Sequence, residues 1–291
     1  MSALDSYNVL GVCAALCFGV TLADGHPVPA HARHGVASMR IASGSIVADP
    51  LLLELCPHER IVALSPRIGE NPRYAQRARG IATLANPSEI ERVLALAPDL
   101  LIVSHFANPQ VLARLRERGI DVLDLGPMHG RETLLANIDA VAQLCGAPER
   151  GRAIATRLAT RMDALAAQTP IAARPRGMYL AVYATKLFGG TRRTSYHDVL
   201  TAAGILDVAA ERYQGWPELS PEQVLSLAPA LFVTKQGMGP ILCTRPGLEL
   251  SRACREGQVV EIEATLIDDP GLAMAEAAET LHALVQRKAR R

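Results

Sequence analysis

The sequence predicts an α/β protein built from two similar lobes with parallel sheets, joined by one long helix. Short apolar stretches alternate with helical stretches along the chain, which is typical of parallel sheets. A similar pattern occurs twice, as VLALAPDLLIVS at residues 93–104 and as VLSLAPALFVTK at residues 224–235. Residues 148–168, between the two copies, form one long amphipathic stretch. We interpret the two copies as an internal duplication.

Residues 1–38 are predicted to be a signal peptide followed by a disordered leader. Val9 to Ala23 is apolar but short for a membrane span, and its last residues, Thr-Leu-Ala, suit signal cleavage. The preceding residues lack Lys and Arg and include Asp5, so a misassigned start or a buried helix is the alternative. Residues 24–38 are rich in Pro, Ala and His and are typical of a solvated linker. We expect export to the periplasm.

The composition fits a packed soluble protein and gives little sign of a polyanionic partner. Hydrophobic residues make up 49% of the 291 residues and charged residues 20%. The net charge of +1 argues against nucleic acid or an anionic membrane surface as the partner. Aromatic residues are only 4%, so each one near a predicted binding edge is informative.

The first lobe, residues 39–147, alternates strands with helices. Leu100 to Ser104 follows the first Ala-Pro pair as an almost wholly apolar strand, which indicates burial on both faces. Ser88 and Glu91 have the spacing of a capping box at the start of a helix. The predicted strands are 39–42, 60–65, 100–104 and 122–125, and the predicted helices are 47–55, 71–79, 88–97, 109–118 and 133–144.

The linking helix is predicted over residues 148–168. Pro148 suits the first helical position, where its missing N–H is not needed, and Thr169-Pro170 ends the helix. Its apolar stripe consists of Ile154, Leu158, Met162 and Leu165.

The second lobe, residues 169–291, repeats the alternation. Gly189-Gly190-Thr191 is expected to open a loop. The predicted strands are 178–183, 231–234 and 259–262, and the predicted helices are 196–203, 220–227, 248–252 and 272–285.

Four cysteines remain after the predicted signal segment. Cys243 and Cys254 flank a short loop and helix and form the predicted disulfide, which an exported protein permits. The pairing of Cys56 and Cys145 stays open, and four buried thiols are the alternative. The absence of a C-x-x-C sequence disfavours a redox motif or a zinc ribbon.

Several segments together resemble a known family. RIVALSP, NPSEIERVLALAPDLLIVS and LARLRERGIDVLDL resemble the first lobe of periplasmic binding proteins for ferric siderophores, haem and cobalamin. YHDVLTAAG, GWPELSPEQVLSLAPALFVT and REGQVVEI resemble their second lobe. The resemblance runs from about residue 39 to residue 285. The Trp-Pro-x-x-Ser-x-Glu-Gln-Val-Leu run at 216–225 is most similar to the cobalamin-binding members.

The resemblance implies a non-enzymatic receptor with its ligand between the lobes. The expected partners are the permease and the ATPase of an ABC importer, and the expected ligand is a cobalt or iron chelate, with no intrinsic cofactor. We expect a monomer. Asp49 and Asp198 correspond to the acidic positions, usually Glu in the family, that dock onto the permease. The alternative for both is stabilisation of a helix N-terminus.

The ligand-binding residues are expected in the loops after the strands, because ligands of open α/β sheets bind at the carboxyl ends of the strands. An indole buries a flat chelate well, a phenolate or an imidazole can ligate the metal, and a cation can pair with carboxylates of the ligand. Ordinary loop packing and surface charge are the alternatives. The candidates are Trp216, Tyr183, Tyr196, His105, Arg67 and Lys235.

Two other functions compete with the receptor. A chelatase-like enzyme would need a His and Glu pair, for which His105 or His129 with Glu261 or Glu263 are available. A haem scavenger or sensor without a transporter is the second alternative. G-x-S-x-G, H-E-x-x-H and Walker sequences are absent, which disfavours the enzyme. Binding of a free metal is disfavoured because His and acidic residues do not cluster at ligand spacing.

Overall fold

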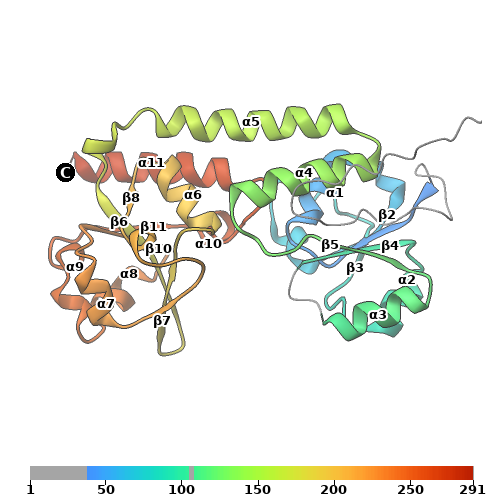
Figure 1. The fold of residues 1–291 in the computed structure, drawn as a ribbon, viewed down its shortest axis with the longest axis horizontal. Helices are drawn as coiled ribbons and strands as arrows, with labels where there is room; N and C mark the ends of the chain where they lie inside the picture. The colour runs from blue at the N-terminus through green and yellow to red at the C-terminus, as the bar shows by residue number, and fades with distance from the viewer. Residues whose placement is uncertain (1–37, 105–107, 291) are drawn as a thin grey trace, which may run out of the picture.

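The structure is a computed structural model that describes residues 38–104 and 108–290. Two sheets, each flanked by helices, lie side by side, and one long helix runs along one side of the molecule, outside the helices of both lobes (Figure 1). The predicted signal segment lies outside the described residues. In the described part of the chain, every helix is too short or too polar to cross a membrane.

The N-terminal lobe is built on a five-stranded parallel sheet in the order β3-β2-β1-β4-β5. Strand β4 is completely buried, as its apolar sequence predicts. The strands are β1 (Ile41–Ser43), β2 (Ile61–Leu64), β3 (Ala82–Thr83), β4 (Leu100–Val103) and β5 (Asp121–Asp124). The helices are α1 (Ala48–Leu55), α2 (Ile90–Leu96), α3 (Pro109–Glu117), α4 (Arg131–Cys145) and the short 3-10 helices η2 (His58–Arg60) and η3 (Pro66–Glu70).

The C-terminal lobe contains a six-stranded sheet in the order β11-β10-β6-β7-β9, with β8 paired to β6. This sheet is not wholly parallel, because β7 runs antiparallel to both β6 and β9. Its strands are β6 (Arg176–Tyr183), β7 (Lys186–Gly190), β8 (Leu206–Asp207), β9 (Glu218–Leu219), β10 (Leu231–Lys235) and β11 (Val259–Ile262). The helices are α6 (Ser195–Ala202), α7 (Pro221–Ser226), α8 (Gly239–Cys243), α9 (Arg252–Arg255), α10 (Ala264–Ile267), α11 (Met274–Ala289) and the 3-10 helices η4 (Ile171–Ala173), η5 (Ala209–Glu211) and η6 (Leu248–Leu250).

Helix α5 (Pro148–Ala166) links the lobes and packs on α4 and α11. The predicted stripe is confirmed, since Ile154, Leu158, Met162 and Leu165 are all buried. They belong to one apolar cluster that also includes Leu51 of the first lobe and Leu281 of the second. The two lobes therefore share a continuous core on the α5 side, while the opposite face of each sheet has its own cluster.

In each lobe, one predicted element has a different conformation in the structure. Residues 71–79 form successive turns where the sequence predicts a helix. Gly189-Gly190 lies in β7 instead of opening a loop, because it pairs with Tyr179 and Leu180 across the β6–β7 hairpin. Glycine is required at residue 190, since a Cβ there would lie 2.6 Å from Tyr196 Cγ.

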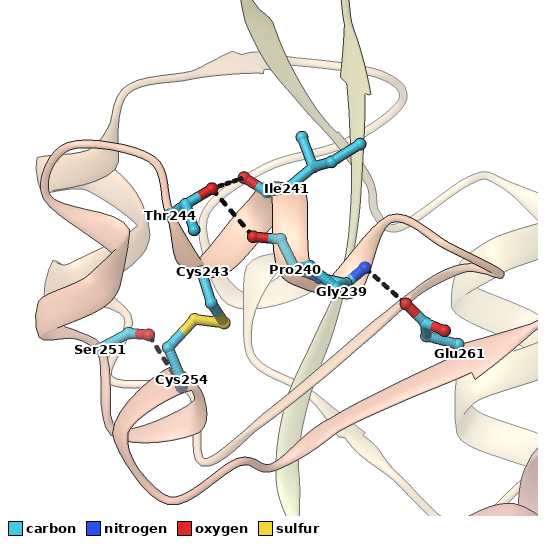
Figure 2. The surroundings of a disulfide bond; sticks show 8 residues. All are labelled: Gly239, Pro240, Ile241, Cys243, Thr244, Ser251, Cys254 and Glu261. Atoms are coloured by element: carbon cyan, nitrogen blue, oxygen red, sulfur yellow. Dashed lines mark hydrogen bonds between the residues drawn. A yellow bond between two sulfur atoms is a disulfide. The ribbon is translucent and has the colours of Figure 1, made fainter.

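Two disulfides each join a pair of helices. The predicted bond between Cys243 and Cys254 is present and joins α8 to α9 (Figure 2). At the other end of α8, Gly239 N donates to Glu261 Oε1 of β11 at 2.6 Å, so the helix is held at both ends (Figure 2). Cys56 and Cys145 form the second bond, which joins the ends of α1 and α4.

Candidate functional site

Trp216 lies on an aromatic cluster of the C-terminal lobe. Its indole is 42% exposed and meets the Tyr196 ring edge to face, with centroids 4.4 Å apart. The Tyr179 ring lies 4.2 Å from the Tyr196 ring and 6.0 Å from the indole. The loop that carries Trp216 is fixed to β7, because Gly189 N donates to Pro217 O. An exposed indole on a rigid aromatic support can pack against a flat ligand.

A carboxylate and an ammonium group complete this cluster. Asp268 Oδ1 accepts a hydrogen bond from the Tyr196 hydroxyl at 2.7 Å, and Asp268 Oδ2 accepts one from Lys235 Nζ at 3.2 Å. Lys235 Nζ also donates to the hydroxyl of the half-exposed Tyr183 at 3.1 Å. Burial opposes the charge of Lys235, but these two oxygens outweigh it and raise the pKa of Lys235, so the side chain stays cationic.

The structure thus brings together four of the predicted ligand residues, Trp216, Tyr196, Tyr183 and Lys235. Their roles differ from one another. Tyr196 is buried, and desolvation together with the charge of Asp268 raises its pKa, so the phenolate needed for haem ligation is disfavoured there. The buried Tyr196 ring instead packs against the indole of Trp216 and supports it. Tyr183 and Trp216 are the exposed members of the cluster.

Arg67 reaches the same region from the N-terminal lobe. It lines a cavity of about 50 Å³ together with Glu70 on its own side and Asp268 and Asp269 on the other. This volume is far below the roughly 300–1,000 Å³ of a small-molecule pocket. The cavity is therefore the narrow junction between the lobes, and a chelate needs more room than it provides.

The burial of Asp49 argues against the docking role predicted for it. Asp49 is fully buried at the start of α1, where a membrane partner cannot reach it. Its Oδ2 accepts hydrogen bonds from the backbone N and the hydroxyl of Ser65, while Oδ1 has no hydrogen-bond partner among the described residues. Desolvation raises the pKa of Asp49 to about 7, against the lowering effect of the Ser65 bonds. Ser65 of the first lobe holds its carboxyl group, and Asp49 also lines the interlobe cavity.

Asp198 joins the lobes. It is half-buried on α6, and its Oδ2 accepts a hydrogen bond from Arg131 N, at the first turn of α4 in the other lobe, at 2.5 Å. Gly130 permits this approach, because a Cβ on Gly130 would lie 2.1 Å from the same oxygen. The carboxylate satisfies a free N–H at a helix N-terminus, as the alternative interpretation expected, although the helix belongs to the opposite lobe. A docking role for Asp198 stays a prediction.

The remaining candidates do not form a reactive pair in the described structure. His105 lies outside the described residues. His129 Nδ1 lies 2.7 Å from Arg193 Nη2, while Glu261 accepts from Gly239 N. Within residues 38–104 and 108–290, no three His, Cys, Asp or Glu side chains are grouped to hold a metal ion.

Sequence reasoning missed Tyr179 and Asp268. Tyr179 is fully buried, and its position in the apolar strand β6 gives no sign that its hydroxyl lies 3.5 Å from Asp268 Oδ1. Asp268 lies in a loop that was expected to border the site, after β11 and α10. An acidic pair before a proline in such a loop was the available signal, but the Tyr196 and Lys235 partners depend on the tertiary structure.

The chain is similar to proteins of one family. The sequence profile of the periplasmic binding protein family matches residues 58–266. The vitamin B12-binding protein of Photorhabdus laumondii is 28% identical over 206 residues, which cover 67% of this chain and 74% of that protein. The vitamin B12-binding protein of Yersinia pestis is 26% identical over 176 residues, which cover 60% of this chain and 61% of that protein.

Solved structures share the fold. The haem-binding protein RhuT of Roseiflexus superposes with a TM-score of 0.73 at 22% identity, over 87% of this chain and 99% of that one. The vitamin B12-binding protein BtuF of Vibrio cholerae superposes with a TM-score of 0.68 at 22% identity, over 88% and 99% of the two chains. Both comparisons support the two-lobed architecture that the sequence predicts.

Proposed function

Because the chain belongs to the periplasmic binding protein family, we propose that it captures a metal chelate between its lobes and delivers it to an ABC importer. The chelate is a corrinoid, a ferric siderophore or a haem, since proteins similar to this chain are vitamin B12-binding and haem-binding proteins. The observation that carries the proposal is the exposed Trp216 held against Tyr196. The Tyr196 hydroxyl shares Asp268 with Lys235, and Asp268 also lines the interlobe cavity with Arg67. Such a site binds ligands and carries out no reaction.

The partners and the location follow from the same proposal. A membrane permease and its ATPase receive the ligand, and the receptor acts as a monomer. The chain is exported and cleaved near Ala23. Its two disulfides support this location, because disulfides form and persist in an oxidising compartment. The intact mass of protein purified from its native host tests the cleavage, because a chain that still begins at Met1 contradicts it.

Titration of Trp216 fluorescence with cyanocobalamin, haemin and a ferric hydroxamate tests the ligand class. Trp216 is the only Trp, so its emission reports this site alone. Calorimetry must accompany each titration because coloured chelates also absorb the emitted light. Trp216→Ala should weaken the bound chelate by at least about tenfold, or about 1.4 kcal/mol, through the loss of indole burial.

Ile171→Ala is the matched control, since Ile171 is 75% exposed and lies on η4, outside the aromatic cluster. It should leave the affinity unchanged. Binding weaker than millimolar for all three chelates would contradict the receptor function. Tight binding that Trp216→Ala does not alter would contradict only the placement of the ligand on the indole.

A further inference from the structure

Asp268 connects the aromatic and the cationic parts of the proposed ligand site. Its Oδ1 accepts from the hydroxyl of Tyr196, the ring that supports Trp216, and its Oδ2 accepts from Lys235. Its side chain is only 18% exposed and that of Lys235 only 17%, so their attraction is weakly screened by water. One carboxylate therefore fixes the position of the indole support and balances the ammonium charge.

The interlobe cavity that Asp268 lines holds one cationic side chain, Arg67, beside several acidic ones, among them Asp269. Burial raises the pKa of Asp269 to about 6, while the backbone N–H of Gly271 and the guanidinium groups of Arg67 and Arg73 lower it. Arg73 also forms an ion pair with Glu276 of α11. An anionic ligand that recruited these cations would have to displace or share their carboxylate partners. The cations in and beside this cavity therefore lie among carboxyl groups.

We propose that Asp268 determines specificity by keeping the charge of the site low, so that the receptor favours a chelate with a neutral periphery over one with free carboxylates. This inference rests on the proposed function. A neutral corrinoid would pack on Trp216 without disturbing the Lys235–Asp268 pair. A haem carries two carboxylates, which compete with Asp268 for Lys235 and meet repulsion from Asp268 itself.

Asp268→Asn tests the proposal because Asn has nearly the same shape. Its amide oxygen can still accept from Tyr196, while its NH2 group faces Lys235 and leaves the ammonium unbalanced. Cyanocobalamin and haemin should be titrated by calorimetry against the whole chain. The ratio of the cyanocobalamin Kd to the haemin Kd should rise by about tenfold, or about 1.4 kcal/mol. Asp163→Asn, which removes an exposed acid of α5, is the matched control and should leave the ratio unchanged.

Lys235→Gln provides an independent test of the charge balance. It leaves Asp268 without its cation, so the ratio of the cyanocobalamin Kd to the haemin Kd should fall. If Asp268 acts through Lys235, the double variant should have a ratio close to that of the unmodified protein. Near-ultraviolet circular dichroism confirms folding, and Lys235→Gln alone decides the outcome if Asp268→Asn does not fold. Equal weakening of both chelates by Asp268→Asn would show a purely structural role and overturn the proposal. If the unmodified protein binds neither chelate at millimolar concentration, both this inference and the proposed chelate class are contradicted. If it binds one of them and Asp268→Asn does not change the ratio of the two Kd values, only this inference is contradicted.

Discussion

The two lobes repeat one scaffold but present different chemistry. In each repeat a helix ends at an Ala-Pro pair, and Ala97 and Ala228 both have positive φ, 45° and 48°. Each alanine leads into a buried inner strand, β4 or β10. Since positive φ is unusual for alanine, its presence at both equivalent positions supports the duplication.

The aromatic side chains are not repeated. The second lobe holds the single Trp, four of the six Tyr and two of the four Phe of the chain, namely Trp216, Tyr179, Tyr183, Tyr196, Tyr213, Phe188 and Phe232. The antiparallel β6–β7 hairpin, which the first sheet lacks within its described residues, holds Tyr183 and packs against Tyr196. The two lobes thus share a scaffold, whereas aromatic side chains gather in the second lobe alone, beside the charged Lys235 and Asp268.

The two disulfides provide the largest expected contrast between the lobes. The Cys56–Cys145 bond closes a sequence separation of 89 residues and the Cys243–Cys254 bond one of 11. In the chain-entropy view, removing the first by Cys56→Ala with Cys145→Ala should lower the free energy of unfolding by about 4.5 kcal/mol, against about 3 kcal/mol for Cys243→Ala with Cys254→Ala. Urea unfolding of both double variants measures the difference. A larger loss from the second pair would contradict the prediction.

Burial raises the pKa of both Asp49 and Asp198, which the sequence places at equivalent helices, and the shift is large for Asp49. The pKa of Asp49 is raised to about 7 in the folded protein, so folding takes up a proton and stability falls as pH rises from about 4 to about 7. Asp49→Asn removes this loss. Its stability relative to the unmodified protein should therefore increase by about 3 kcal/mol between pH 5 and pH 8.

Urea midpoints at the two pH values measure this change. Asp163→Asn is the control, because the Arg131 hydrogen bond lowers the pKa of Asp163 and keeps it ionised throughout this range. If the difference in the free energy of unfolding between Asp49→Asn and the unmodified protein is the same at pH 5 and pH 8, Asp49 is not protonated in the folded protein.

The smallest contrast concerns the serines that precede the repeated helices. Ser220 forms a capping box with Gln223 at the start of α7, whereas α2 begins after Glu89, without a side-chain cap from the described residues. Ser220→Ala should therefore lower the free energy of unfolding by about 1 kcal/mol, and Ser88→Ala by less than about 0.5 kcal/mol. Thermal unfolding of the two variants provides the measurement, and equal losses would mean that Ser88 caps α2 in solution.

The capping prediction shows how local signals succeed and fail. The spacing of Ser88 and Glu91 matches a capping box, but Ser88 N donates to Asn86 Oδ1 in a turn that delays the helix start. The same type of signal, Ser220 with Gln223, is realised in the second lobe. A short capping motif fixes a helix start only when the preceding chain approaches in the right conformation.

The sequence by itself determined the two-lobed α/β scaffold, the α5 stripe and the Cys243–Cys254 bond, because apolar periodicity and short separation are local properties. It also indicated that Trp216, Tyr183, Tyr196 and Lys235 belong to one edge of the second lobe. Only the tertiary structure placed Asp268 between Tyr196 and Lys235, and only burial removed Asp49 from the surface. The contacts of Asp268 and the burial of Asp49 depend on side chains that are distant in sequence and meet only in the folded protein. The loss of water around these groups and their pairing therefore arise only when the lobes have packed.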